Sequence, residues 1–420
     1  RTPCTDRTRG PLTNTTTLLA WRNIWRHPRR TLLTIAAMVF ADVLLIFMLG
    51  LQLGQYRMMI DNSLAIFTGQ MQVQADGYND EPYMYRTIAA ADALAEDIRA
   101  RTQLEAVATR GYGFALVSSE TRTLGAQISG VDPQFEPRVS TLPGLIKQGR
   151  YLGGKADNEI VIGSTLARNL RIEPGDELTI LGSGRDGSMA ATVTPVVGIY
   201  ESGNRDMDRM MLSMPLDTFR DVFSMGDTAH SIVIGGERDR ADRIATGAQA
   251  ALTNKDSLVL LDWEALMPGL KQAIQADFTS AWFMYAVLII LVAFGMLNTM
   301  LMSVLERTHE FGILLALGVG HGKLGRMIVT ESAVLATTGM LIGILIGAVV
   351  VGYYLVNGFT YPGMEAMGER FNIPSVLRPE VSLRSLLPGP LAVFLATMLA
   401  SLYPILHMRK LRPTEALQAV

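Results

Sequence analysis

Four long apolar runs divide the chain, and each is long enough to cross a bilayer as a helix. They cover residues 31–53, 281–304, 328–356 and 385–408. A transmembrane helix needs about 20 mostly apolar residues. The first run is too long for the apolar region of a signal peptide, and no small-residue cleavage site follows it, so we expect it to be retained. The pattern predicts transmembrane helices at 31–55, 281–304, 328–356 and 385–408.

The charged residues beside these runs predict which side of the membrane each connection occupies. Basic residues gather in three segments, which contain Arg22, Arg26, Arg29 and Arg30, then Arg307, Lys323 and Arg326, and finally Arg409, Lys410 and Arg412. Cytoplasmic connections carry an excess of Lys and Arg. We therefore place residues 1–30, 305–327 and 409–420 in the cytoplasm. By alternation, residues 56–280 and 357–384 lie outside.

Shorter patterns between the first two runs predict a folded domain. Segments typical of strands lie at 70–76, 106–117, 124–131, 159–163, 177–181, 192–200, 229–236 and 257–262. Segments typical of helices lie at 91–100, 164–170 and 239–253. Prolines and glycines at 131–154 predict a subdomain boundary, with a β-rich insertion around 132–214. We expect the segments on either side of the insertion to form one subdomain, and stalk helices to join the domain to the membrane.

The predicted fold class is an α-helical membrane protein with four transmembrane helices per protomer and a large α+β extracytoplasmic domain between the first and second helices. The composition agrees, because the 420 residues have a mean hydropathy of +0.25 and only 18% are charged. A net charge of −2 offers no basic surface for nucleic acid. The single cysteine, Cys4, excludes an intrachain disulfide.

The N-terminal segment 1–30 ends in an amphipathic stretch. Trp21 and Trp25 alternate with Arg22 and Arg26 before a His-Pro break. Tryptophan settles at the headgroup level and arginine meets anionic lipid, so this pattern predicts an interfacial helix on the cytoplasmic leaflet. The alternative is an ordinary basic flank of a transmembrane helix.

Asp42 falls near the middle of the first apolar run. An ionisable group there costs about 2.5–3.5 kcal/mol on insertion scales. One interpretation is a protonated or hydrogen-bonded carboxyl that fixes helix packing. The other is that Asp42 tunes movement of this helix. Asn298 and Glu331 are further polar residues within or beside the predicted spans.

The third apolar run carries a stripe of small residues, Gly339, Gly343 and Gly347. Glycines four residues apart on one helix face allow another helix to approach closely. We expect this stripe to pack within the protomer, and a dimer contact is the alternative.

Two segments resemble nucleotide-binding motifs and fail on inspection. GRYLGGKA at 149–156 has the spacing of a phosphate-binding loop, but Ala156 stands where a hydroxyl must bind magnesium. LVLLDWE at 258–264 resembles a strand that ends in a magnesium-binding aspartate, but the predicted topology puts it outside, away from ATP. The five histidines are scattered without metal-ligand spacing. We therefore assign no catalytic residue, no metal site and no cofactor to the chain.

The segment VLERTHEFGILLALG at 304–318 resembles the ABC permease family that includes MacB, LolC, LolE and FtsX, whose pattern is approximately ERTREIGILRALGA. The match extends to AWRNIWRHPRRTLLT at 20–34, to Asn298 and Glu331, and to RKLRPTEAL at 409–417. His309 and Leu315 stand where the family often has arginines. In the predicted external domain, GQMQVQADGY and EIVIGSTLARNLRIEPGDELTI are similar to the lipoprotein-release and MacB-like branch.

The resemblance makes 305–327 a segment that couples to an ATPase. Its candidate coupling residues are Glu306, Arg307, Glu310, Phe311, Gly312, Leu314, Leu317 and Gly318. Phe311, Leu314 and Leu315 form an apolar face at helical spacing, which predicts docking in a groove, and Gly318 suits a helix C-terminus. The alternative is a short interfacial helix without a partner.

The resemblance also implies partners and a mechanism. The expected partners are two copies of a cytoplasmic ABC ATPase, which would bind ATP and Mg, a second permease protomer and the lipid bilayer of the inner membrane, with the large domain in the periplasm. ATP-driven movement would be transmitted outward to release a lipoprotein or another hydrophobic substrate. An FtsX-like regulator of an external cell-wall hydrolase and a membrane-embedded enzyme are the alternatives.

Overall fold

The chain forms two units, a helical unit and an α/β unit. The helical unit comprises Arg1–Arg57, Gln275–Thr360 and Val376–Val420, and the α/β unit comprises Met58–Ile274 and Tyr361–Ser375. The computed structural model describes residue 26 and residues 28–236, 240–253, 255–317, 319–360, 362, 364 and 376–408. For residues 407 and 408 it describes the backbone alone.

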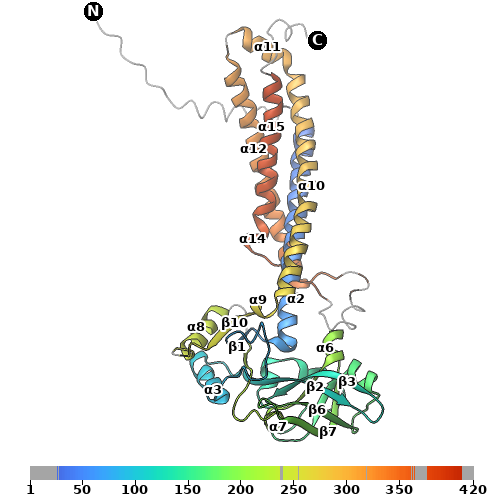
Figure 1. Ribbon diagram of the computed structural model, residues 1–420. Helices are drawn as coiled ribbons and strands as arrows, with labels where there is room; N and C mark the ends of the chain where they lie inside the picture. The colour runs from blue at the N-terminus through green and yellow to red at the C-terminus, as the bar shows by residue number, and fades with distance from the viewer. Residues whose placement is uncertain are drawn as a thin grey trace, which may run out of the picture. The chain divides into compact units, whose positions relative to one another are not determined.

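The helical unit contains a long helix for each apolar run (Figure 1). These are α2 (Pro28–Ser63), α10 (Pro268–Glu306), α12 (His321–Asn357) and α15 (Pro388–Met408), accompanied by the short helices α11 (Thr308–Ala316) and α14 (Leu383–Leu386). The last turns of α2 and the first turns of α10 belong to the α/β unit. α2 begins at a proline, whose fixed φ suits the first helical position. Within the described residues, four helices are long and apolar enough to cross a membrane.

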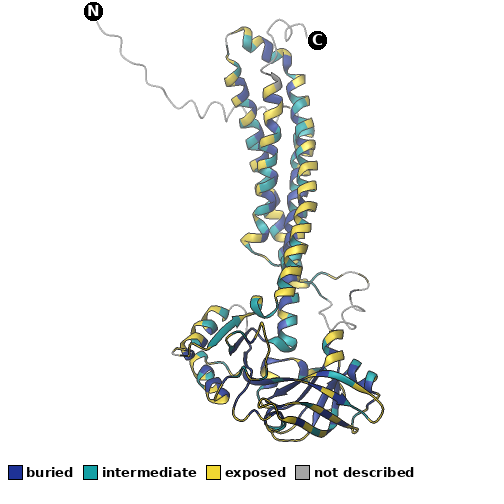
Figure 2. Cartoon of the chain, viewed as in Figure 1, coloured by how far each residue is buried: buried dark blue, intermediate teal, exposed yellow. Residues whose placement is uncertain are grey.

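Helices of the helical unit bury one face and leave large apolar side chains on the other (Figure 2). A core of Met38, Leu45, Tyr285, Met300 and Val393 holds the long helices together. Phe40, Leu291, Leu345 and Leu399 are each more than half exposed. A helix that is apolar all round is typical of a membrane span rather than of a water-soluble bundle.

The α/β unit contains a four-stranded antiparallel sheet with the order β10-β1-β9-β2. Its strands are β10 (Leu258–Asp262), β1 (Met71–Ala75), β9 (Ser231–Ile234) and β2 (Val107–Ser118). Helices α3 (Ala91–Thr102) and α8 (Ala241–Ala251) pack on this sheet through Leu94, Ile98, Ile244 and Ala248. Strands from both ends of the segment therefore form one subdomain, as the sequence predicts.

Six strands of the same unit close into a barrel. The ring runs β2-β3-β8-β5-β7-β6 and returns to β2. The further strands are β3 (Thr123–Val131), β5 (Ile160–Gly163), β6 (Glu177–Ser183), β7 (Met189–Tyr200) and β8 (Met211–Pro215), and β4 (Ile146–Gly149) pairs with β7. Ile128, Ile162, Ile180 and Leu212 fill the interior, and closure removes the sheet edges.

In the described part of the α/β unit, four short helices accompany the barrel, together with α9 (Trp263–Leu266) and two single-turn helices, η1 (Leu64–Thr68) and η2 (Leu142–Leu145). The four short helices are α4 (Glu136–Val139), α5 (Ser164–Leu170), α6 (Arg205–Met210) and α7 (Leu216–Val222). The sequence pattern predicts α5 with its observed bounds, but it does not predict α4, α6 or α7. Helices of four to seven residues are too short to show a clear 3.6-residue period.

The predicted limits of the β-rich insertion, 132–214, are wrong. β2 and β3 precede residue 132 and belong to the barrel. β2 is long enough to serve both sheets, because Val107–Arg110 pairs with β9 and Ala115–Ser118 pairs with β6. A strand that continues from one sheet into the next shows no change of pattern, so the composition shift appears only after β3.

Candidate functional site

The candidate site lies where α10 turns into α12. α10 ends at Glu306, Arg307 precedes the short helix α11, and α12 begins at His321. The hydroxyl of Thr308 donates to the carbonyl of Leu305 over 2.8 Å, which fixes the turn between α10 and α11. The predicted coupling segment is thus one short helix between two long ones.

The inner face of α11 packs inside the helical unit. Phe311 is 2% exposed and contacts Val304, Leu324, Ile328 and Ile405 in one cluster. Leu314 and Leu315 are partly buried against that cluster. The predicted docking face built on Phe311 is therefore wrong. An apolar i, i+3, i+4 pattern shows that one helix face is covered, but it does not show whether a partner or the chain itself covers it.

The outer face of α11 carries the apolar side chains of Ile313 and Ala316, with His309 before them and Leu317 directly after the helix. Ile313 is 44% exposed and Leu317 is 75% exposed, and His309 and Ala316 are also exposed. Ile313 is four residues from His309, three from Ala316 and four from Leu317. Positions three or four residues apart share one side of a helix. Leu317, a predicted coupling residue, lies on this face, whereas Phe311, Gly312 and Leu314 do not.

Two ion pairs connect the start of α2 with α11 and the end of α10. Arg26 Nη1 lies 2.8 Å from Glu310 Oε1, and Arg30 Nη1 lies 2.5 Å from Glu306 Oε2. Arg30 also donates to the hydroxyl of Ser303 over 3.1 Å. Arg26, predicted as an interfacial residue, instead contacts the coupling segment. This pairing is not predictable from the sequence pattern, because the two partners are 284 positions apart.

Arg307 joins the coupling segment to α12. Its side chain is 13% exposed and lies 3.3 Å from Glu310 and 3.4 Å from Glu331. Burial raises the pKa of Glu310, but hydrogen bonds and charges from Arg26 and Arg307 outweigh burial, so this pKa lies below its ordinary value. The exposed pair Arg26–Glu310 contributes about 0–1 kcal/mol, and the more buried pair Arg307–Glu331 also loses hydration when it forms. The network therefore orients α11 more than it stabilises the fold.

The glycine stripe of α12 packs on α2 of the same chain. A Cβ added at Gly339 would meet Met38, and one added at Gly343 would meet Asp42. Gly347 lies against Ile46 in the same way. The three glycines of α12 and their three partners on α2 are each spaced four residues apart. The glycines therefore let the backbones of α2 and α12 approach closely.

Asp42 is completely buried at this helix contact. Its relative exposure is 0%, and neither carboxylate oxygen has a hydrogen-bond partner among the described residues. A buried polar group without a partner costs free energy. Asp42 is therefore an unsatisfied group at the α2–α12 contact, and its role in helix movement stays a prediction.

A second polar cluster joins α2 to α10 in the helical unit. The hydroxyl of Tyr56 donates to Asp277 over 2.5 Å. Gln52 donates to Tyr56 over 2.7 Å and accepts from the hydroxyl of Tyr285 over 2.7 Å. The sequence does not predict this cluster, because single polar residues on two helices far apart in sequence carry no shared spacing.

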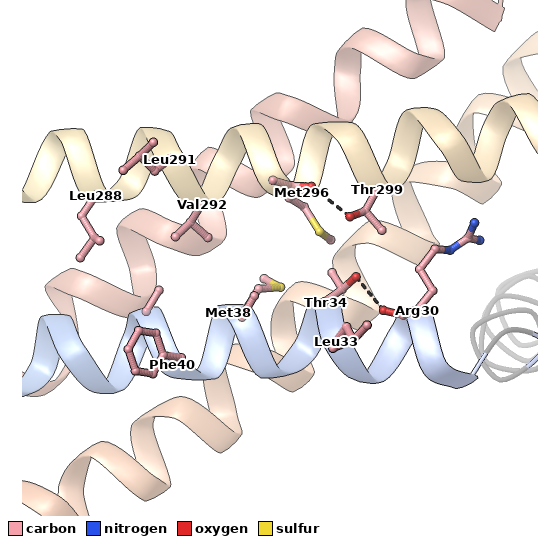
Figure 3. Close-up of a pocket in the computed structure, with 13 residues that line it drawn as sticks. Arg30, Leu33, Thr34, Met38, Phe40, Leu288, Leu291, Val292, Met296 and Thr299 are labelled. Atoms are coloured by element: carbon pink, nitrogen blue, oxygen red, sulfur yellow. Dashed lines mark hydrogen bonds between the residues drawn. The ribbon is translucent and has the colours of Figure 1, made fainter.

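An apolar groove of about 520 Å³ lies between α2 and α10 (Figure 3). Leu33, Met38 and Phe40 line it from α2, and Leu291 and Met296 line it from α10. The two threonines in the groove donate their hydroxyls to backbone carbonyls of their own helices. The groove therefore presents an almost wholly apolar surface, with the guanidinium of Arg30 at one end.

The remaining predicted site residues divide into two groups. Trp21, Arg22, Trp25 and Gly318 lie outside the described residues. Asn298 is exposed on α10 and does not join the ion-pair network around Glu331. Among the described residues there is no cluster of three or more side chains suited to holding a metal.

The resemblances to nucleotide-binding motifs have structural explanations. Asp262 caps the short helix α9 (Trp263–Leu266), accepting the backbone N–H of Ala265 over 3.0 Å. Residues 150–159 form a loop without the helix that a phosphate-binding loop requires.

These features define a polytopic permease with a large folded domain between its first two apolar helices. A family model for the MacB-like periplasmic core domain matches residues 31–251, which is more than half of the chain. A model for the FtsX-like permease C-terminal region matches residues 282–413. The chain belongs to the MacB-type family of ABC transporter permeases.

Named relatives cover most of the chain at low identity. The lipoprotein-releasing system transmembrane protein LolC of Xylella fastidiosa is 23% identical over 80% of this chain and 84% of its own length. The pyoverdine export ATP-binding/permease protein PvdT of Pseudomonas aeruginosa is 24% identical over 80% of this chain. The alignment covers 51% of PvdT, so the chain spans about half the length of that relative. The periplasmic region of MacB from Actinobacillus actinomycetemcomitans is 17% identical over 50% of this chain and 94% of that structure, with a TM-score of 0.37.

Proposed function

We propose that this permease transmits force. A separate cytoplasmic ATPase docks on α11, its ATP-driven movement shifts the helices, and the α/β unit works on a substrate outside the inner membrane. In this proposal the ATPase, in two copies, binds ATP and Mg, and a second permease protomer completes the complex. The family supports the ABC permease role, and the exposed outer face of α11 is the observation that carries the docking step.

The outer face of α11 has the properties of a docking surface. A leucine that is 75% exposed at the end of a short helix has no covering within the described part of the chain. An amphipathic helix that lays apolar side chains into a groove is a common mode of recognition. The pairs Arg26–Glu310 and Arg30–Glu306 would then pass movement of α11 to α2.

The docking step is tested by placing charges on the outer face. We expect the double variant Ile313→Glu and Leu317→Glu to lose copurification of the ATPase and to lower stimulated ATP hydrolysis at least tenfold. Leu383→Glu is the matched control, because Leu383 is 73% exposed on α14 and lies away from α11. Wild-type ATPase binding in the double variant would refute docking at this face.

The proposed substrate class is supported by the groove between α2 and α10. Its lining is apolar, and the named relatives include a lipoprotein-releasing protein and export proteins. We propose that the groove accepts an acyl chain or another hydrophobic group of the substrate. A photoreactive residue at Leu291 is expected to label a fluorescent triacylated lipopeptide, whereas one at Leu345, exposed on α12 and outside the groove, is not.

Equal labelling at the two positions would count against this substrate site. If the lipopeptide labels neither position and an external cell-wall hydrolase copurifies instead, the regulator alternative replaces transport.

Asp42 has a proposed role in the movement of α2. It is buried against Gly343 without hydrogen-bond partners, so any shift between α2 and α12 changes its surroundings. We expect both Asp42→Asn and Asp42→Leu to fold and to change the rate of substrate release coupled to ATP hydrolysis. Wild-type release and hydrolysis in both variants would end this proposal.

A further inference from the structure

The end of α2 differs from an ordinary helix terminus. After Ser63 the helix widens into a single π-helical turn, η1, which closes with a hydrogen bond from Gly69 N–H to the carbonyl of Leu64 over 2.8 Å. π-helical turns are rare and are frequent at functional sites. Only Gly69 and Gln70 separate η1 from β1, so no long linker lies between the helix and the sheet.

The free carbonyls of η1 are bound by groups of the α/β unit. A helix C-terminus leaves its last carbonyls without intrahelical partners. The carbonyl of Ala65 accepts the N–H of Thr141 over 2.8 Å, and that of Ile66 accepts the hydroxyl of Ser140 over 2.7 Å. The carbonyl of Thr68 accepts the side chain of Gln72 over 2.7 Å. Arg110 Nη1 donates to the remaining carbonyl, that of Phe67.

Arg110 is the most deeply buried of these donors. Its side chain and that of Glu136 are both 0% exposed, and two hydrogen bonds of 3.0 and 2.7 Å join them. Burial alone would lower the pKa of Arg110, but the carboxylate of Glu136 outweighs it and raises this pKa above its ordinary value. The guanidinium therefore stays charged, and Glu136 fixes its orientation.

Phe67 completes the contact. Its ring lies 3.9 Å from the guanidinium carbon of Arg110 and meets Tyr112 edge-on at 6.2 Å. The ring also packs against the cluster that contains Val131 and Leu142. Arg110 thus holds one residue of η1 by both its backbone carbonyl and its aromatic face.

We propose that Arg110 is a positioning residue, oriented by Glu136, that locks the end of α2 to the α/β unit so that movement of α2 reaches this unit without slack. This inference rests on the proposed force transmission. A pair that served folding alone would need only the Arg110–Glu136 contact. The additional bond and ring contact to Phe67 connect this pair to the helix.

The first test removes the lock while avoiding an unpaired buried charge. Replacing a buried ion pair by apolar residues of similar volume often preserves the fold. In the complex reconstituted with its ATPase, we expect the double variant Arg110→Met and Glu136→Met to hydrolyse ATP within twofold of wild type. The ATP-dependent change in amide hydrogen exchange across the barrel should fall at least fivefold. Wild-type exchange changes in this variant would overturn the proposal.

The second test uses a covalent lock at the same joint. In a Cys4→Ser background, the pair Ala65→Cys and Thr141→Cys places thiols where the backbones already meet. Oxidation should leave the exchange response of the otherwise native chain within twofold, and should restore it in the double-Met variant. If oxidation abolishes the exchange response of the otherwise native chain and reduction restores it, the contact between η1 and residue 141 must open during function. That result would overturn the proposal. So does a failure to restore the double-Met variant.

The two proposals fail in different ways. If the wild-type complex shows no ATP-dependent exchange change at all, force transmission itself is wrong. If the wild type responds and the double-Met variant responds equally, only the role of Arg110 is wrong. If thermal denaturation shows that the double-Met variant is not folded, the Arg110–Glu136 pair acts in folding and the positioning role is rejected.

Discussion

The α/β unit has two attachments to long helices, and they are built differently. Where the chain enters from α2, four carbonyls of η1 meet donors of the unit, among them the fully buried Arg110. Where it leaves through α9 toward α10, no residue of α9 is buried. Besides the Asp262 cap and backbone bonds, α9 has two side-chain hydrogen bonds among the described residues. The exposed Asn79 donates to the carbonyl of Ala265 over 3.2 Å, and Lys271 donates to Glu264 over 2.5 Å.

This difference indicates which helix delivers movement. Hydrogen bonds and charge pairs shielded from water are costly to break, because each leaves an unsatisfied group behind. Exposed pairs exchange easily with water and contribute little. In the proposed mechanism, a displacement of α2 is therefore carried into the α/β unit, whereas the α9 connection yields. The two attachments also differ at their glycines, which gives the strongest test.

The largest effect on the free energy of unfolding is expected at Gly69, in the connection through which the chain enters the α/β unit from α2 (the entry). Its φ of 76° favours glycine, and an added Cβ would clash with Val233 of β9. We expect Gly69→Ala to lower the free energy of unfolding by about 2–5 kcal/mol, from backbone strain and overpacking together. Chemical denaturation of the full chain in detergent measures this. The matched exit variant, Gly269→Ala, adds a Cβ with nothing within 4 Å in a helix, so it should not destabilise.

Equal destabilisation by the two glycine variants would remove the contrast between the attachments. A neutral Gly69→Ala would show that the entry can move aside, contrary to a rigid joint.

Acid should weaken the entry next. His230 is 0% exposed and donates its backbone N–H to the carbonyl of Arg110 over 2.9 Å. Its Nδ1 accepts the N–H of Tyr112 over 2.9 Å, so the proton of the neutral ring sits on Nε2, which faces the carbonyl of Met84 at 3.2 Å. Burial lowers the pKa of His230 to about 4.

The sign of the pH effect follows from that depressed pKa. Between pH 6.5 and 4 the unfolded chain binds a proton that the folded chain does not, so stability rises with pH across this window and is lost as pH falls. The loss attributable to His230 is about 3 kcal/mol at full extent. We expect denaturation curves of His230→Gln, compared with wild type, to lose this part of the pH dependence. An unchanged pH profile would contradict it.

A smaller effect is expected at Ser140. Its hydroxyl donates to Ile66 and accepts the N–H of Leu142 over 3.1 Å. Ser140→Ala leaves a buried carbonyl and a buried N–H unpaired, which should lower the free energy of unfolding by about 1–3 kcal/mol. The denaturation midpoint of the full chain reports this directly. An effect below the measurement error would mean that water replaces the hydroxyl and that the entry is less dry than its burial indicates.

The sequence predicts the two attachments only in part. The apolar runs and the stalk helices beside them are visible in the pattern, and α2 continues to Ser63, beyond the predicted end of the first transmembrane helix at residue 55. The lock is not visible, because Arg110 and Phe67 are 43 positions apart and a lone arginine within a strand pattern reads as a surface residue. The same limit applies to α11, where the period identifies the apolar residues but not whether the chain itself covers Phe311.

The smallest effects on stability are expected at the exit, the connection through α9 to α10. Small effects there would sharpen the contrast between the two attachments. Asn79→Ala removes one exposed hydrogen bond, which should change the free energy of unfolding by less than about 0.5 kcal/mol. Lys271→Ala removes an exposed ion pair with Glu264 and should give no measurable change. Combined, the two should leave both denaturation and the ATP-dependent exchange response of the barrel as in wild type. A loss of that response with normal stability would show that α10 also delivers movement, and the unit would then be driven from both attachments rather than from α2.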